Sequence, residues 1–99
     1  MKLQALAHAR AGDKGNLVNI AVFAYRDEDY ATLVERVTVE RVSELFRGHI
    51  TRPVIRYCVP NLCALNFVLQ RRPADSVTRS LRLDPHGKSL SSLMLSLEI

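Results

Sequence analysis

Residues 9–25, with the sequence ARAGDKGNLVNIAVFAY, combine a glycine-rich connection with an apolar run. The apolar run, residues 17–25, is rich in β-branched and aromatic side chains, a composition typical of a central strand. Before it, residues 2–9 largely alternate apolar and polar side chains, which predicts a half-buried strand. Gly12 and Gly15 lie between these runs and are free to adopt positive φ. The stretch therefore predicts a hairpin-like connection between two strands.

Two amphipathic helices are predicted after these strands. In residues 27–37, apolar side chains recur at helical spacing after an acidic start, which favours a helix N-terminus. Residues 38–49 restart the same pattern. Thr38 is suited to cap the first turn, and Gly48 follows the last apolar residue of that face.

The second half of the chain mixes strands with segments of ambiguous period. Residues 53–60 begin and end with proline and predict a strand. Residues 61–70 are apolar nearly all round, which predicts a buried helix with Asn61 as N-cap, although the length also suits a strand. Residues 77–83 alternate and predict a strand with one wet face. Residues 89–99 fit both a helical stripe and a strand, and we expect a helix in their first half.

The length and composition predict one soluble domain. The chain has 99 residues, of which 47% are hydrophobic and 24% charged, and no apolar run approaches the roughly 18 residues of a membrane span. We expect a single cytoplasmic α+β domain over residues 1–99, with helices laid on one face of a small mixed sheet.

The cysteines and the net charge narrow the function classes. Cys58 and Cys63 do not have the spacing of a redox or zinc motif, so we expect two buried thiols. The net charge of +4 is carried mostly by arginine, which permits an acidic ligand, an acidic partner chain or nucleic acid.

Residues 12–16 form the first candidate site. Backbone amides flanked by Gly12 and Gly15 can surround an anion, and Lys14 would add a positive charge. The spacing is not that of a phosphate-binding P-loop. A plain tight turn with a solvated Asp13–Lys14 pair and a subunit contact remain alternatives.

Residues 84–88, DPHGK, repeat the theme of an acidic residue followed by Gly-Lys. Asp84 begins a turn pattern, and Lys88 is a second candidate ligand for an anion. His86 titrates near physiological pH and is a candidate general base, although a histidine in such a loop is more often simply exposed. The three histidines lie on separate elements, so neither a metal nor a cofactor is expected.

Three polar side chains interrupt apolar strands. Asn19 lies inside VNIAV and Asn66 inside LNFVL, where an unpartnered amide would cost roughly 1–3 kcal/mol. Each should therefore bond to the backbone of a neighbouring loop or point into a pocket. Arg56, inside VIRYC, needs a carboxylate partner or a ligand for the same reason.

Three segments occur in a characteristic order: ARAGDKGNLVNIAVFA (9–24), VIRYCVPNLCALNFVL (54–69) and SLRLDPHGKSLSSLML (80–95). Together they resemble the small C-terminal domain of the acyclic terpene utilisation (AtuA-like) proteins, over nearly the whole chain. The chain departs from the family pattern at Ala11, where serine is usual, and at residues 71–76, where a glycine-rich loop is common.

The resemblance implies a ferredoxin-like fold and a link to the catabolism of branched acyl-CoA compounds from acyclic terpenes. It also implies a large domain. This chain would then be either a small subunit that binds a separate large subunit or a free-standing form that self-associates. The residues that match the family motifs are Asp13, Lys14, Gly15, Asn19, Arg56, Pro60, Asn61, Asn66, Asp84, Gly87 and Lys88.

Three functions follow as hypotheses. The first is a binding or assembly module that contributes a basic, amide-lined surface to a large subunit, to a second copy or to an acyl-CoA-like ligand. The second is a free-standing hydratase or lyase that uses Asp13 with Lys14 or His86. The third is RNA binding, which would require aromatic side chains on a sheet face, and only 6% of the residues are aromatic.

Overall fold

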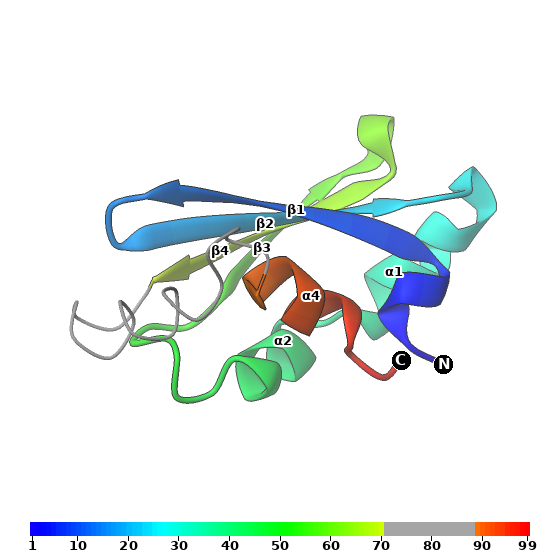
Figure 1. Cartoon of the computed structure of the whole chain (residues 1–99). Helices are drawn as coiled ribbons and strands as arrows, with labels where there is room; N and C mark the ends of the chain where they lie inside the picture. Colours follow the sequence, from blue (N-terminus) through cyan, green and yellow to red (C-terminus); the bar gives the residue numbers. More distant parts are fainter. Residues whose placement is uncertain (71–88) are drawn as a thin grey trace.

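Four strands form one antiparallel sheet in the computed structural model, which describes residues 1–70 and 89–99, apart from the side chains of Lys14 and Ser89 (Figure 1). The strands are β1 (Ala7–Lys14), β2 (Leu17–Ala24), β3 (Ile55–Val59) and β4 (Ala64–Gln70). Their order in the sheet is β1-β2-β4-β3. The predicted strand over 77–83 and the loop over 71–76 lie outside the described residues.

The first hairpin is longer than the sequence predicted. Residues 3–5 form a 3-10 helix, η1 (Leu3–Ala5), and β1 begins only at Ala7, so the predicted strand over 2–9 is wrong in most of its extent. The glycine-rich stretch continues β1, and Lys14 pairs with Leu17. Gly15 opens the two-residue turn at φ +59°, the position where type II′ hairpins favour glycine.

The two amphipathic helices predicted over residues 27–37 and 38–49 are confirmed. A 3-10 turn, η2 (Asp27–Asp29), leads into α1 (Tyr30–Arg36), and α2 (Val39–Leu45) follows. Thr38 caps α2 as expected, because its Oγ1 accepts a hydrogen bond from the amide of Arg41 at 3.2 Å. The tail begins with α4 (Ser89–Leu95), the helix expected in its first half.

The predicted buried helix over 61–70 is wrong. Residues 60–62 form a 3-10 turn, η3 (Pro60–Leu62), Cys63 adopts the left-handed conformation at φ 49°, and β4 follows. The β4 strand lies between β2 and β3 and pairs with both. One face of β4 packs Leu65, Phe67 and Leu69 on the core, whereas the other face alternates apolar side chains with Asn66 and Gln70.

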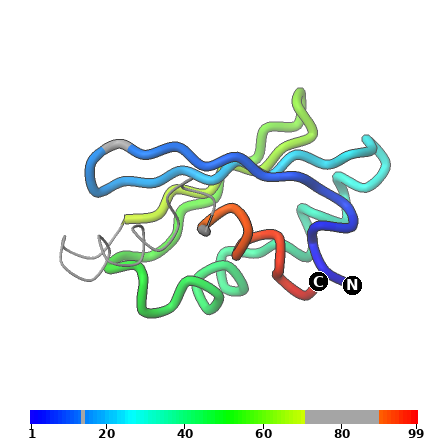
Figure 2. Tube along the Cα trace, in the orientation of Figure 1, coloured from blue at the N-terminus to red at the C-terminus, as the bar shows by residue number. Residues whose placement is uncertain are grey.

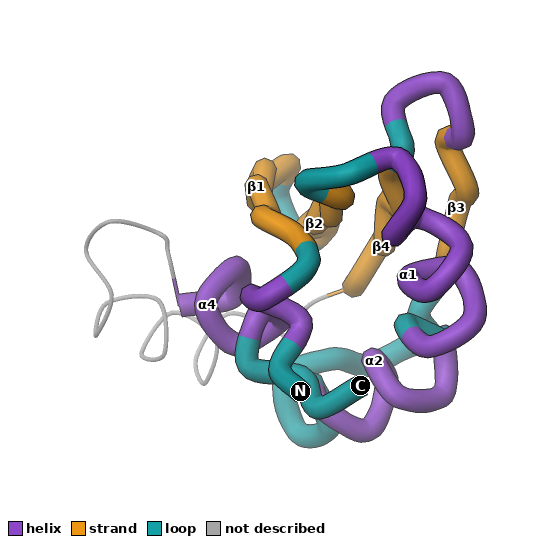
Figure 3. The backbone as a smooth tube through the Cα atoms, turned by 90° about the vertical axis from the view of Figure 1, so that its right-hand side faces the viewer, coloured by secondary structure: helices purple, strands orange, loops and turns teal. Residues whose placement is uncertain are grey.

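The helices α1, α2 and α4 lie on one side of the sheet (Figure 3). Packing brings α4 against β1, α1 against β4 and α2 against α4. The α+β class with helices on one face is therefore confirmed, with every described strand pair antiparallel. The fully buried apolar side chains between the layers include Leu3, Ile20, Val22, Leu33, Val37, Val42, Phe46, Leu65, Phe67, Leu69 and Met94. Among the described helices, none is long and apolar enough to cross a membrane.

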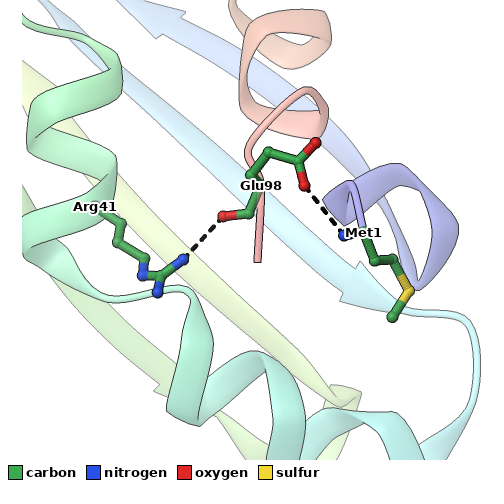
Figure 4. A network of polar contacts seen from close by, with 3 residues as sticks. All are labelled: Met1, Arg41 and Glu98. Atoms are coloured by element: carbon green, nitrogen blue, oxygen red, sulfur yellow. Dashed lines mark hydrogen bonds and ion pairs between the residues drawn. The ribbon is translucent and has the colours of Figure 1, made fainter.

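Residues 1–3 and 97–99 lie side by side (Figure 2). The amide of Leu3 donates to the carbonyl of Leu97 at 2.8 Å, and the amide of Ile99 donates to the carbonyl of Met1 at 2.9 Å. Glu98 extends this contact, since its carboxylate pairs with the Met1 ammonium and its carbonyl accepts from Arg41 Nη1 at 2.9 Å (Figure 4). These bonds hold the segment after α4 against η1 and α2.

Candidate functional site

The sheet face opposite the helices carries most of the described features that suit binding, and we call it the open face. Side chains alternate along a strand, so the strand register assigns its residues in rows. The first row is Gly12, Asn19, Val68 and Ile55; the second is Arg10, Ala21, Asn66 and Tyr57; the third is His8, Phe23, Ala64 and Val59. Leu17 and Gln70 pair beyond the first row.

Apolar side chains on the open face remain exposed to solvent. The exposed fractions are 47% for Leu17, 50% for Ile55 and 53% for Tyr57. Contiguous apolar surface of this kind on a small domain marks an interaction site more often than isolated apolar residues do.

An amide pair occupies the centre of the open face. Asn19 Nδ2 donates to Asn66 Oδ1 at 3.4 Å, across the β2–β4 boundary. Asn19 is exposed and Asn66 half-buried, so the pair lies at the surface. The two amides bond to each other and not to the backbone of a loop, whereas Asn19 does line a pocket, the second alternative that the sequence suggested. Asn19 Oδ1 and Asn66 Nδ2 have no further hydrogen-bond partner among the described residues.

Gly12 makes room for this pair. A Cβ atom at Gly12 would lie 2.8 Å from Asn19 Oδ1, closer than real Cβ contacts allow. Any side chain there would push the Asn19 amide away from its position. The glycine-rich stretch therefore contributes a close approach between two strands as well as a turn, and sequence reasoning did not predict this role.

A shallow cavity lies beside the amides. It has a volume of about 300 Å³ and is lined by Leu17, Val18, Asn19 and Val68. The lining is apolar apart from the Asn19 amide. No motif predicted it, because its walls come from two strands that are distant in the sequence.

Aromatic rings gather at the other end of the open face. His8 stacks on Phe23 with ring centroids 5.1 Å apart, and Tyr25 lies 5.5 Å from His8. Because side chains alternate along β1 and β2, His8 and Phe23 lie on the same face. Their contact depends on the strand register.

Arg56 lies on the opposite face from the amides. Its register partner is Phe67, a core residue, and its Nη1 donates to the carbonyls of Val34 at 2.8 Å and Val37 at 2.9 Å. These carbonyls are at the C-terminal end of α1, where a cation is favoured by the helix dipole. Backbone groups thus provide the partner for which the sequence suggested a carboxylate or a ligand.

The other predicted site residues are dispersed or lie outside the description. Asp13 and Lys14 end β1 and Gly15 opens the turn, with Asp13 paired to Val18. Asn61 is exposed on η3, beyond the third row. Asp84, His86 and Lys88 fall outside the described residues.

The cysteines are not buried, which corrects the sequence expectation. Cys58 is exposed because it lies on the edge strand β3, and Cys63 is partly exposed. Cys63 Sγ donates to Asp27 Oδ1 at 3.3 Å, and this carboxylate raises the pKa of the thiol. Tyr30 lies nearby: its hydroxyl donates to the Ala64 carbonyl at 2.9 Å, and burial raises its pKa.

The sequence match agrees with this architecture. A family model described as the AtuA ferredoxin-like domain matches residues 1–99. No curated protein and no solved structure matches the chain. Because the match extends over the entire length, the chain belongs to the family of AtuA ferredoxin-like domains.

Proposed function

We propose that the chain is a binding and assembly module in branched acyl-CoA or terpenoid catabolism, and that it binds through the open face. The observation that carries this proposal is the combination of exposed apolar side chains with two amides at the centre of a sheet face that no described helix covers. Apolar side chains supply binding energy on burial, and the amides restrict which partner fits.

The chemistry of the open face suits recognition better than proton transfer. Its central residues are amides, small residues and apolar side chains, and Asp13 extends from the opposite face. Amides hydrogen-bond a carbonyl or another amide without changing protonation state. A thioester carbonyl with a branched apolar chain and the backbone or amide groups of a protein both meet these requirements.

The test compares one variant on the open face with one elsewhere. Val68→Asp places a charge at the centre of the open face and in the cavity wall, whereas Gln4→Glu places the same charge on η1, where Gln4 is exposed. Three measurements are made on the full chain: binding to a large AtuA-like protein by co-purification, titration with branched acyl-CoA by calorimetry, and self-association by sedimentation.

We expect at least one of these interactions in the unchanged chain, lost with Val68→Asp and retained with Gln4→Glu. Circular dichroism checks that both variants fold. If no interaction is found, or if both variants retain it equally, the open face is not the binding surface and the proposal fails.

A further inference from the structure

We propose that the open face binds a second copy of this chain, with the two sheets packed face to face about a two-fold axis parallel to the strands and between β2 and β4. This inference rests on the proposed function, and it names the partner of the same surface. Three independent features of the face, its relief, its charge and its free amide groups, agree with this symmetry.

The two-fold rotation determines which strands meet. It exchanges the two sides of the sheet and keeps each row in place, so β1 faces β3 of the second copy and β2 faces β4. Facing sheets pack about 10 Å apart with their strands nearly aligned, which leaves room for one interdigitated layer of side chains. Each row of the open face is then opposed to the same row in reverse order.

Large side chains then oppose small ones. Phe23 faces Ala64 of the second copy, and Ile55 faces Gly12 of the second copy, beside the Asn19 amide that lies over this glycine. The symmetry produces each of these contacts twice. An isologous interface requires such self-complementarity, and a face with large residues on both opposed strands would not provide it.

The charge of the face is also accommodated. Within the three rows of the open face, Arg10 is the permanently charged side chain, and it lies on β1, which is outermost among the described strands. In the dimer each Arg10 faces Tyr57 of the second copy, where a cation on an aromatic ring is favourable. The two Arg10 residues lie on opposite margins of the interface. The usual strand spacing separates them by about 14 Å across the strands.

The amides supply the most specific argument. A buried interface must satisfy Asn19 Oδ1 and the N–H groups of Asn66, which have no partner among the described residues, because leaving such groups unpaired is unfavourable. Rotation places Asn66 of the second copy over Ala21, next to Asn19. A pair with one free acceptor and one free donor is complementary to itself, so four amides close a ring around the axis.

The size of the face sets the expected affinity. Strands of seven or eight residues and four strands across give about 25 by 19 Å of sheet, below the roughly 800 Å² per partner of a standard interface. We therefore expect a reversible dimer with a dissociation constant in the micromolar range.

Sedimentation velocity over a micromolar concentration series tests the dimer. Asn66→Asp brings two carboxylates close to the axis and should raise the dissociation constant about tenfold or more. Gln4→Glu is the matched amide-to-carboxylate control and should leave it unchanged. Circular dichroism reports whether each variant folds.

A charge exchange tests the symmetry itself. Tyr57→Lys places a cation opposite Arg10 of the second copy and should weaken the dimer, and adding Arg10→Glu should restore it. Positions 10 and 57 lie on opposite margins of one sheet, so an intrachain pair cannot explain the rescue. Rescue supports the two-fold arrangement.

A dimer that Asn66→Asp does not weaken, or that shows no rescue, overturns the inference. A chain that stays monomeric throughout also overturns it. If that monomer binds a large AtuA-like protein or an acyl-CoA through the open face, the proposed function stands without the second copy; if it binds neither, both fail. Binding of single-stranded RNA that Tyr57→Lys alters would likewise assign the face to another partner.

Discussion

Arg56 illustrates how a charged residue in a family motif serves the fold. Its guanidinium bonds to two carbonyls at the end of α1, from a strand that is separated from this helix by α2. The cation thereby joins the edge of the sheet to the helical layer. A helix end that lacks such a partner leaves its last carbonyls to solvent.

Arg56→Met keeps most of the apolar stem and removes the donors. Because hydrogen bonds from charged groups contribute about 1.5–3 kcal/mol, we expect the free energy of unfolding in urea to fall by about that amount. Arg52→Met is the control, since Arg52 is exposed and has no hydrogen bond or ion pair among the described residues. Equal stabilities for the two variants would mean that Arg56 does not anchor α1.

Asn19, unlike Arg56, is a polar residue that faces away from the helices. It belongs to a strand whose alternate residues Val18 and Ile20 are fully buried, yet its own side chain lies on the open face. The amide contacts Gly12 on one side and Asn66 on the other. Three strands therefore determine where one polar group lies.

At the scale of elements, Tyr30 fixes α1 to the β3–β4 hairpin. Its hydroxyl donates to Ala64 at the start of β4. Burial disfavours the phenolate and raises the pKa of Tyr30 above its ordinary value, with a further contribution from the negative form of Cys58. The folded chain thus holds this proton more tightly than the unfolded chain does.

This difference predicts a pH dependence. Since the folded-state pKa is raised, the stabilisation is complete below about pH 10 and is lost as the pH rises through the folded-state pKa. Tyr30→Phe should be less stable by about 1 kcal/mol at neutral pH and should lose less stability on alkaline titration. Parallel alkaline curves for the unchanged chain and Tyr30→Phe would contradict this role.

At the scale of the whole molecule, one sheet separates two different environments. The described α-helices bury one face, and none of them covers the other (Figure 3). The β2 and β4 strands are hydrogen-bonded on both sides, whereas β1 and β3 are the outermost of the described strands. The two central strands therefore have hydrogen-bonded neighbours on both sides and also carry core side chains.

Hydrogen exchange followed by NMR should show this order. Amides at the centres of β2 and β4 should exchange most slowly, since their opening requires disruption of two strand pairs and of the core. Amides of β3 should exchange faster, because this strand is short and three of its five residues are exposed. Protection in β3 equal to that in β4 would show that another segment covers this edge.

The sequence by itself determined several local elements and the family. The composition of residues 17–25, the period of residues 27–37 and the Thr38 cap depend on neighbours along the chain, and each was confirmed. Local patterns report local interactions, which explains this success.

Only the tertiary structure decided the nature of residues 61–70 and the position of the amides. An apolar run of that length satisfies a buried helix and a central strand equally, and pairing with β2 and β3 selects the strand. Asn19 and Asn66 are 47 residues apart, so their contact depends on strand order and register. Long-range pairing fixes both, because a one-residue slip would turn every side chain of a strand to the other face.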